Sequence, residues 1–331
     1  MNGPVFPADT ALPASNRNSW PAPLLDPRWL VIRNPAAGRS RRDRAWLAFE
    51  RALRRAGVQF DVHSTHGPGD GARLAQAAMA AGLHRVLVAG GDGSVHEALN
   101  GLMRARDTDG ASAPVPTLVP VPLGTGNDWA RTLGLPRDPD RLAALVAHGA
   151  PRPHDAGVIS FASRGSDPCW FVNVAGAGFD AHVLARLPVP TPSRVAYLAG
   201  ALRELQRYQS PRFHIATDDA PAREGRWLLA LVANGRYCGH RMHVAPCAVV
   251  DDGRFDVVTI DEVGLLRALP KLAALYAGTV LRDPLVRHVT AARVRIDSDP
   301  SVAVEADGQL VGTTPAEFTV MPGALLALRG A

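Results

Sequence analysis

The sequence predicts an α/β N-terminal domain with a doubly wound, mostly parallel sheet, followed by a mostly antiparallel β-sandwich domain. Three observations support this fold class. Short apolar runs alternate with helical periodicity up to about residue 150, and short β-type runs dominate afterwards. Two early strands each lead into a glycine-rich turn and a helix start, a pattern typical of sheets that bind ligands at the carboxyl ends of their strands. The 331 residues also exceed the usual size of one hydrophobic core.

The N-terminal domain is expected over residues 28–150. It would follow a flexible leader over residues 1–27, which is rich in Pro and Ala and lacks a signal-peptide-like apolar run. Apolar runs and helical spacing predict its elements in chain order. They are a strand at 29–33, a helix at 41–56, a strand at 58–64, a helix at 71–81, a strand at 86–89, a helix from Ser94, a strand from Thr117 and a helix at 139–148.

The C-terminal domain is expected over residues 151–331, and its last strand could return to the first domain. Short β-type runs separated by turn residues predict strands, and two longer segments at about 193–208 and 263–281 predict helices. The glycine-rich segment 176–181 is interpreted as a close-packing turn. The expected strands are 156–161, 169–175, 211–217, 226–233, 255–260, 293–297, 301–306 and 317–320.

The composition is that of a globular protein with an anionic partner. The net charge is +5 and the basic residues are almost all arginine, which suits a nucleotide or an acidic membrane surface but is also common in ordinary soluble enzymes. No arginine cluster with interleaved aromatics favours nucleic acid. The chain contains no run of about 18 apolar residues, so no transmembrane helix is expected. Three cysteines show no disulfide framework and favour a reducing, cytoplasmic location.

The segment from Val86 to Glu97 carries the first functional signal. Four apolar residues lead into Gly90-Gly91-Asp92-Gly93, and a helical pattern follows. The amide groups and positive end of a helix at such a turn bind anions, most often phosphate. A carboxylate in the turn would repel a bare phosphate, so Asp92 is expected to act through Mg²⁺ or water. The alternative is a tight turn in which Asp92 caps the helix.

A second strand, turn and helix start runs from Thr117 to Arg131. Gly124 and Gly126 allow close approach of the backbone, Thr125 offers a hydroxyl, and Asn127 and Asp128 are caps or ligands of a hydrated metal. Neither turn is a P-loop, because the Gly-Lys-Ser/Thr ending is missing. The single lysine of the chain, Lys271, is distant in sequence. Any phosphate must therefore be bound by backbone amides, arginine or a metal.

Three segments together resemble a known family. Residues 34–38 (Asn-Pro-Ala-Ala-Gly), 90–94 and 122–128 resemble, in order and spacing, the signature blocks of the diacylglycerol kinase catalytic domain. This family includes bacterial soluble lipid kinases and the sphingosine and ceramide kinases. The block at 90–94 alone is shared with NAD kinases and phosphofructokinases, so only the combination is specific. The likeness continues to the C-terminus.

The resemblance implies an ATP site in a cleft between the domains. Adenine and ribose would lie near 34–38 and Thr65, and the phosphates on the amides of 91–94. Asp92 and Asp128 would hold the catalytic Mg²⁺, and Arg39 stands where many relatives have lysine. Trp129 replaces the usual Phe, and the resemblance does not say how the larger ring packs. The implied nucleotide-binding residues are Asn34, Pro35, Gly38, Arg39, Thr65, Gly90, Gly91, Asp92, Gly93, Ser94, Gly124, Thr125 and Asn127.

Two further carboxylate sites are implied by the resemblance. Asp307 would accept the proton of the attacking hydroxyl, although the family's Asp-Gly-Glu block here ends in Gln309. The alternative is an Asp-Gly hairpin turn. The carboxylate of Asp252 and the carbonyls of Val249 and Arg254 would bind a structural Mg²⁺. The alternative there is again a plain turn.

In the family an aspartate network links this structural metal toward the active site, and Asp155 is the expected counterpart. A zinc site at Cys238, His240, His243 and Cys247 is rejected, because that spacing matches no common zinc motif.

The predicted function is that of an ATP-dependent lipid kinase. It would transfer the γ-phosphate of ATP to a lipid hydroxyl, with diacylglycerol the favoured substrate type, and it would contact a membrane surface peripherally. A homodimer is possible. One alternative is a kinase of a soluble substrate such as NAD. Another is a nucleotide-binding protein that has lost catalysis, an interpretation that Gln309 keeps open.

Overall fold

The chain forms two units, the first comprising residues 1–154 and 324–331 and the second residues 155–323. The computed structural model describes residues 28–35, 41–109, 114–162, 168–186, 194–218 and 220–330. The expected leader, with Gly38 and Arg39, lies outside the described residues. None of the helices in those ranges combines the length and hydropathy needed to cross a bilayer. The units, called unit 1 and unit 2 below, are described separately.

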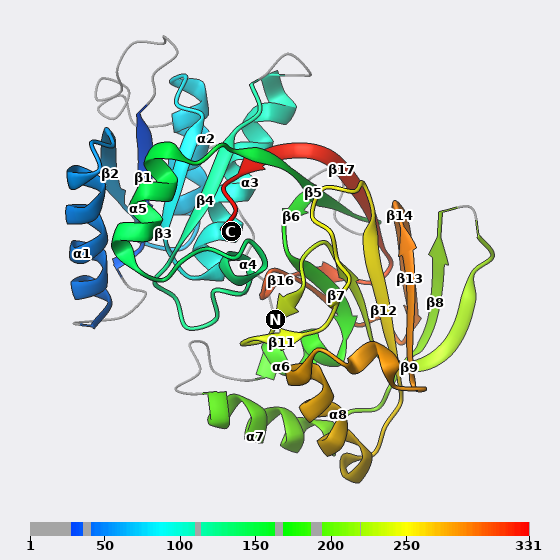
Figure 1. The fold of residues 1–331 in the computed structure, drawn as a ribbon. Helices are drawn as coiled ribbons and strands as arrows, with labels where there is room; N and C mark the ends of the chain where they lie inside the picture. Colours follow the sequence, from blue (N-terminus) through cyan, green and yellow to red (C-terminus); the bar gives the residue numbers. More distant parts are fainter. Residues whose placement is uncertain are drawn as a thin grey trace. The chain divides into compact units, whose positions relative to one another are not determined.

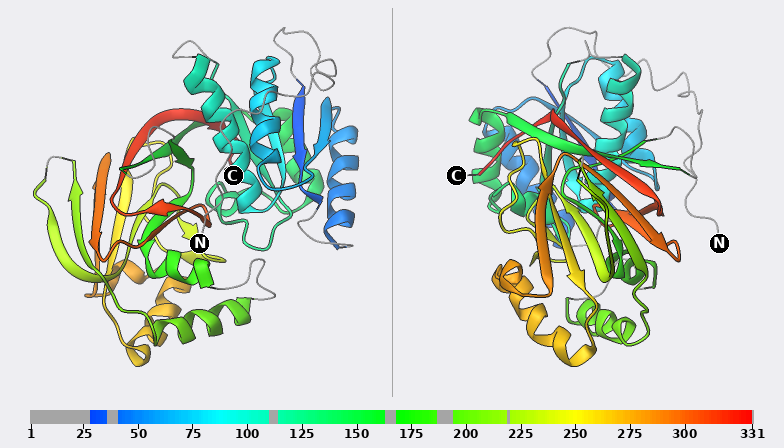
Figure 2. Two further views of the ribbon diagram at one scale, coloured as in Figure 1. Left: turned by 180° about the vertical axis from the view of Figure 1, so that it is seen from behind. Right: turned by 90° about the vertical axis from the view of Figure 1, so that its right-hand side faces the viewer.

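Unit 1 contains a parallel sheet with the strand order β2-β1-β3-β4. The helices α2 and α3 pack on one face, while α5, with α1 against it, covers the other (Figures 1 and 2). This is the doubly wound arrangement expected from right-handed crossovers. The elements are β1 (Trp29–Arg33), α1 (Arg41–Arg55), β2 (Phe60–Ser64), α2 (Asp70–Ala80), β3 (Arg85–Gly90), α3 (Asp92–Asp109), β4 (Thr117–Pro122), α4 (Asp128–Thr132) and α5 (Pro139–His148).

Local chemistry explains these elements. The strands β3 and β4 are almost wholly buried, as expected for the interior of a parallel sheet. Asp138 caps α5 by accepting a hydrogen bond from the amide of Arg141, and Pro139 occupies the first turn. The helices α2 and α3 approach closely at Gly101, where an added Cβ would lie 2.1 Å from the carbonyl oxygen of Ala72. Only glycine permits that crossing.

In its described residues, unit 2 is built from antiparallel strands, three α-helices and a short 3₁₀ helix. The long strand β9 is central, because its first part pairs with β8 and its second part with β7 and β12. The helices α6, α7 and α8 lie together at one end of the unit (Figure 1). The elements are β5 (Arg152–Phe161), β6 (Cys169–Phe171), β7 (Val174–Gly178), α6 (Phe179–Arg186), α7 (Arg194–Leu205), β8 (Arg212–Thr217), β9 (Arg223–Ala233), β10 (Tyr237–Cys238), β11 (Met242–His243), β12 (Phe255–Asp261), α8 (Leu265–Ala277), a 3₁₀ helix (Val280–Arg282), β13 (Val286–Ala291), β14 (Arg293–Asp299), β15 (Ala303–Ala306), β16 (Gln309–Thr313) and β17 (Ala316–Ala327).

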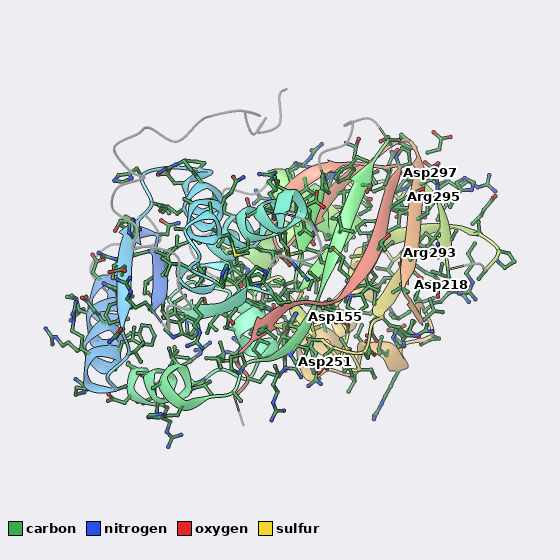
Figure 3. All side chains as sticks on the ribbon, turned by 90° about the horizontal axis from the view of Figure 1, so that it is seen from above. Asp155, Asp218, Asp251, Arg293, Arg295 and Asp297 are labelled. Atoms are coloured by element: carbon green, nitrogen blue, oxygen red, sulfur yellow. The ribbon has the colours of Figure 1, made fainter. Side chains whose placement is uncertain are left out.

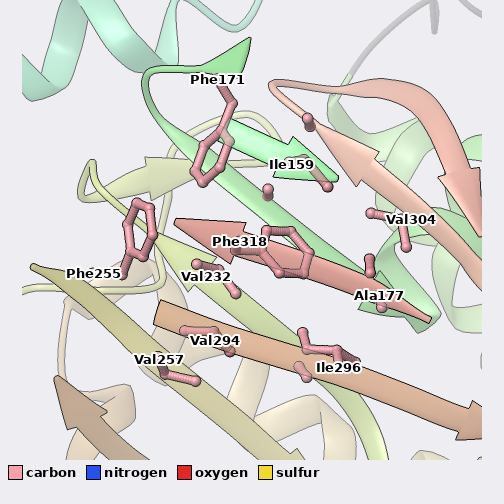
Figure 4. Close-up of a cluster of buried hydrophobic side chains, with 14 of the residues drawn as sticks. Ile159, Phe171, Ala177, Val232, Phe255, Val257, Val294, Ile296, Val304 and Phe318 are labelled. Carbon is pink, nitrogen blue, oxygen red and sulfur yellow. The ribbon is translucent and has the colours of Figure 1, made fainter. Parts of the chain in front are cut away.

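The core of unit 2 lies between its sheet layers. Phe171 stacks on Phe255 at 5.5 Å and meets Phe318 edge-on at 6.3 Å, and Ala177 and Val304 belong to the same cluster on the other side of Phe318 (Figure 4). The predicted fold class, a parallel α/β domain followed by a mostly antiparallel β-sandwich, is confirmed. The last strand, β17, begins in unit 2, and its final residues belong to unit 1, where Leu326 pairs with Thr117 of β4.

Several expected elements differ in detail. The helix expected from Ser94 begins two residues earlier, at Asp92, so the aspartate belongs to its first turn. The segment interpreted as a turn at 176–181 is the end of β7 and the start of α6. The strand expected at 169–175 is divided into β6 and β7. The strands β10, β11, β13 and β16 were not predicted.

Candidate active site

The parallel register of unit 1 gathers the predicted phosphate-binding segments at one edge. Arg33 of β1 pairs with Ser64 of β2 and with Ala89 of β3, and Ala89 pairs with Val121 of β4. The residues that follow these positions therefore emerge side by side at the carboxyl ends of the strands. They are Asn34, Thr65, Gly90 and Pro122.

The two glycine turns touch each other. An added Cβ at Gly124 would lie 2.6 Å from the Cα of Gly91, so the contact requires glycine. Asn127 holds the second turn in place, because its side-chain amide donates to the carbonyl oxygens of Gly124 at 2.7 Å and Pro122 at 3.2 Å. Its backbone adopts the left-handed conformation with φ 52°, which asparagine tolerates better than most residues. The turns thus form one continuous surface.

Two carboxylates lie together at this surface. The amide of Asp128 donates to Oδ1 of Asp92 at 3.0 Å. An added Cβ at Gly126 would lie 2.6 Å from Oδ2 of Asp92 and 3.6 Å from Oδ2 of Asp128, so both Oδ2 atoms border the same small space. Asp92 begins α3, where the helix end presents backbone amides. Two carboxylates beside such amides match the oxygen ligands that Mg²⁺ takes from a protein when phosphates supply others.

The remaining predicted nucleotide residues surround this point. The side-chain amide of Asn34 donates to Oγ of Ser94 at 2.9 Å, which ties the end of β1 to the first turn of α3. Gly90 allows this contact, because an added Cβ would lie 2.6 Å from Ser94. Thr65 is buried, whereas Thr125 is exposed on the second turn. Pro35 is also exposed, and Gly38 and Arg39 lie outside the described residues.

Two supporting contacts in unit 1 were missed from the sequence. Glu97 accepts hydrogen bonds from the amides of Gly69 at 2.9 Å and Gly71 at 3.0 Å, and so caps α2 from the neighbouring helix. The indole of Trp129 donates to Nε2 of His154 at 3.0 Å, with both side chains buried. This bond explains how the tryptophan is accommodated. The sequence offered one indirect signal for this bond, because the N–H of a buried indole needs a hydrogen-bond acceptor.

Asp307 is positioned by backbone amides of unit 2. It lies in the turn between β15 and β16 with φ 49°. Its Oδ1 accepts from the amides of Asn173 at 3.0 Å and Val174 at 3.3 Å, and its Oδ2 from that of Val172 at 3.0 Å. The carboxylate is therefore fixed at the junction of β6 and β7. Gln309 is exposed at the start of β16.

The predicted metal loop is attached to Asp155. The amide of Gly253 donates to Oδ2 of Asp155 at 2.7 Å, and that of Gly323 to Oδ1 at 2.8 Å. Burial raises the pKa of Asp155, the two amides oppose this, and the charges of Asp252 and Asp251 raise the pKa further. Asp155 and Asp251 are labelled in Figure 3. The charges of two neighbouring carboxylates thus act on Asp155, and a cation bound there would offset them.

The described residues offer few side-chain ligands for a metal ion. No group of three or more His, Cys, Asp and Glu side chains there is placed to hold a metal ion, and this includes the rejected zinc segment. A hard cation at the loop would need backbone carbonyls and water besides the aspartates, and the predicted carbonyl ligands of Val249 and Arg254 stay a prediction. Asp252 also accepts a hydrogen bond from the amide of Arg254 at 3.0 Å within its own turn.

An apolar cavity of about 140 Å³ lies in unit 2 among α6, α7, α8, β9 and β12. An almost wholly apolar lining of this kind suits hydrocarbon. No sequence pattern indicated it, because its lining comes from segments that each look like ordinary core. Representative lining residues are Val183, Leu202, Leu205, Leu231, Ile260 and Leu275.

Comparisons with known proteins agree with the geometry. The family model described as "Diacylglycerol kinase catalytic domain" matches residues 28–159, and the one described as "YegS C-terminal NAD kinase beta sandwich-like domain" matches residues 173–329. A "Probable lipid kinase YegS-like" of Chromohalobacter salexigens is 31% identical over 276 residues, covering 82% of this chain and 85% of the relative. The "Diacylglycerol kinase" of Bacillus subtilis is 28% identical over 294 residues, covering 87% and 91%.

A solved structure shares the fold. The crystal structure of a diacylglycerol kinase from Bacillus anthracis str. Sterne superposes with a TM-score of 0.69 at 23% identity, covering 92% of this chain and 97% of that one. The predicted resemblance is confirmed. The chain belongs to the diacylglycerol kinase catalytic-domain family, among the lipid kinases that carry a YegS C-terminal domain.

Proposed function

We propose that this protein transfers the γ-phosphate of ATP to the hydroxyl of a lipid of the diacylglycerol type. The observation that carries the proposal is the contact of the two glycine turns in unit 1, with Asp92 and Asp128 beside it. A kinase needs such a surface, because backbone amides and a metal must together bind the phosphates where no lysine is available. Membership in a lipid kinase family supports the same reaction.

The nucleotide is assigned to unit 1. The amides at the start of α3 would bind phosphate oxygens, and Thr125 and Ser94 offer hydroxyls close by. Asp92 and Asp128 would hold Mg²⁺, which supplies charge neutralisation on the transferred phosphoryl group when bound. Asn34, Pro35 and Thr65 would border the adenine and ribose. Gly38 and Arg39 remain assigned to this site by the resemblance.

The acceptor side is assigned to unit 2. Asp307, fixed by three backbone amides, would accept the proton of the attacking lipid hydroxyl. Loose phosphoryl-transfer transition states need little base assistance, so a carboxylate that chiefly orients the hydroxyl is sufficient when Gln309 replaces the family glutamate. The apolar cavity would accept part of the hydrocarbon, and the protein would act at a membrane surface from the cytoplasm. The loop of Asp252 would hold a structural Mg²⁺ near Asp155.

The test is transfer of labelled γ-phosphate into defined vesicles. The full chain is incubated with ATP, Mg²⁺ and anionic vesicles containing diacylglycerol. Asp92→Asn, which keeps the shape and an acceptor for the amide of Asp128, should abolish transfer. Asp107→Asn, an exposed aspartate on the same helix, is the matched control and should keep it. The proposal is supported if the wild type and Asp107→Asn label the lipid and Asp92→Asn does not.

Other outcomes would favour the alternatives. Label in NAD or another water-soluble acceptor, with none in lipid, would indicate a soluble-substrate kinase. ATP binding without transfer to any acceptor would indicate a nucleotide-binding protein, and Gln309→Glu would then test whether the missing carboxylate is the cause. Equal transfer by wild type and Asp92→Asn would refute the assignment of the site.

A further inference from the structure

The turn that carries Asp307 contains a second buried carboxylate. Glu305 lies two residues before Asp307 on β15, and only 6% of its surface is exposed. Its Oε2 accepts a hydrogen bond from the amide of Gly308 at 2.8 Å. Glutamate is seldom buried unless specific partners hold its carboxylate. The position of Glu305 therefore indicates a role in this turn.

The backbone of this turn is unfavourable at Asp307. Ala306 pairs with Gln309, so Asp307 and Gly308 form a two-residue hairpin loop, and both have positive φ, 49° and 78°. This is the pattern of a type I′ turn. Glycine adopts a positive φ freely, whereas aspartate does so at a cost. The surroundings of Asp307 must therefore maintain its conformation.

The hydrogen bonds of the Asp307 carboxylate depend on this conformation. The backbone amide of Asp307 donates to the carbonyl oxygen of Val174 at 2.9 Å, while the carboxylate accepts from the amides of residues 172–174. All these bonds join one turn residue to one short segment of the chain. A rotation of the turn would therefore move the carboxylate away from the three amides together.

Glu305 fixes the other half of the turn. Gly308 lies between the two strands and is exposed, so its amide would otherwise be bound by water. The Glu305 carboxylate replaces that water with a bond inside the protein, and this bond is strong because the acceptor is charged. The loop is thus held at both of its central residues, Asp307 at the junction of β6 and β7 and Gly308 at β15.

The register of β15 directs Glu305 away from the core. Val304 and Ala306 belong to the hydrophobic core of unit 2, so Glu305 between them projects from the opposite face of the strand (Figure 4). The pairing with β16 shifts at this point, because Val304 pairs with Gly312 and Glu305 with Leu310. Such bulges re-aim a side chain and are common next to active sites. The irregularity thus lies where a side chain must be directed to the turn.

We propose that Glu305 is a positioning residue for Asp307. By holding the amide of Gly308, it keeps the turn in the conformation that presents the Asp307 carboxylate to the lipid hydroxyl. The inference rests on the proposed function for the role of Asp307 as proton acceptor. Gln309, in the same hairpin, is exposed and carries no charge. The carboxylate that supports Asp307 in this chain is therefore Glu305, which acts through the turn and does not itself contact the lipid.

The first measurement is amide hydrogen exchange by NMR on the full chain without ATP or lipid, which makes it independent of catalysis. Glu305→Met keeps the length of the side chain but removes its oxygen atoms. It should speed exchange at Gly308 and at residues 172–174 by about tenfold or more, because a hydrogen bond to a charged group is lost. Glu317→Met, at an exposed glutamate of β17, is the matched control and should leave these amides unchanged. If Glu305→Met does not fold, Glu305→Gln replaces it and should raise exchange at Gly308 and at 172–174 together, by a smaller factor.

The second measurement is a double-mutant cycle on phosphate transfer to lipid. Glu305→Met should lower kcat by about tenfold or more with little change in the KM for ATP, because a small displacement of a reacting group has a large effect on the rate. Glu305→Gln keeps a neutral acceptor for the amide of Gly308 and should stay within about threefold of wild type. In the Asp307→Asn background, Glu305→Met should cause no further fall, since Glu305 acts only through Asp307.

The outcomes separate this inference from the proposed function. Rapid exchange of the Gly308 amide in the wild type, or faster exchange at Gly308 alone in the variants, would overturn the inference. An equal fall in kcat with and without Asp307 would also overturn it, because that is the result expected of a merely structural residue. Faster exchange at residues 172–174 in Glu305→Met, without phosphate transfer by any variant or the wild type, would support the positioning of Asp307 and remove the kinase assignment.

Discussion

Replacement of Asp180 by asparagine should stabilise unit 2 above neutral pH. The pKa of Asp180 rises from 3.8 to about 7 because its carboxyl is buried. The folded state therefore disfavours the charged form, and the destabilisation appears as pH rises above about 4 and is complete above about 7. A shift of about three units corresponds to about 4 kcal/mol as an upper limit. Asparagine has nearly the same shape and carries no charge, so it removes this cost.

The assay is thermal unfolding of wild type and Asp180→Asn at pH 5 and pH 8, followed by calorimetry. Because the chain has two units, the transition of unit 2 is compared by itself. The upper limit corresponds to an increase of roughly 10 °C in Tm at pH 8 for a unit of this size. At pH 5 less than about half of the gain should remain. Glu262→Gln, at an exposed acid of the same unit, is the control and should show no pH-dependent gain. A variant that is less stable than wild type at pH 8, or a gain independent of pH, would refute the reasoning.

Four further substitutions test the site. Asp128→Asn should lower the rate of phosphate transfer by more than about 100-fold while the circular dichroism spectrum is unchanged; a normal rate would remove Asp128 from the metal site. Asp307→Asn should lower kcat and leave the KM for ATP nearly constant, and steady-state kinetics with an unaltered kcat would exclude it as proton acceptor. Asp252→Ala should lower both the Tm of unit 2 and the rate, and should abolish any stabilisation by added Mg²⁺; normal melting and activity would argue against the structural metal. Trp129→Phe should destabilise unit 1 by about 1–3 kcal/mol in chemical denaturation, because it removes the donor to the buried Nε2 of His154; wild-type stability would show that this bond is dispensable.

The elements that the sequence predicted best are those whose signals are local. The strand at 29–33 and the helix at 139–148 occur with the expected bounds. The strand is a short apolar run, and the helix begins with an Asp-Pro cap and continues with apolar spacing. The strand β13, in contrast, has partly exposed polar residues and no apolar run. Its position comes from pairing with β12 across distant sequence.

The helix α6 was concealed by the glycine-rich strand that precedes it. Gly176 and Gly178 are needed because β7 packs tightly, with Gly178 at φ 118°. Closely spaced glycines in sequence favour a turn, so the eight residues from Phe179 were not expected to form a helix. The close packing that was predicted for these glycines is present, but in a strand instead of a turn.

The proximity of the turns in unit 1 could be predicted from the sequence, because parallel strands end at a common edge of the sheet. Asn34, Gly90 and Ser94 meet there, as the spacing of the turns indicated. The contacts of Glu97 and His154 were not recoverable. Each depends on a partner more than twenty residues away, and neither a capping glutamate nor a buried histidine has a sequence pattern of its own.

The two carboxylates near β7, those of Asp307 and Asp180, differ in their hydrogen bonding. Asp307 receives three backbone amides, as expected for a group held in one position for chemistry, whereas Asp180 is left without a hydrogen bond in the described structure. A residue kept for stability would lose stability on replacement. Asp180→Asn should instead gain stability above neutral pH. A gain of stability on replacement is typical of a group that is not kept for stability, because functional sites commonly reduce the stability of the free protein.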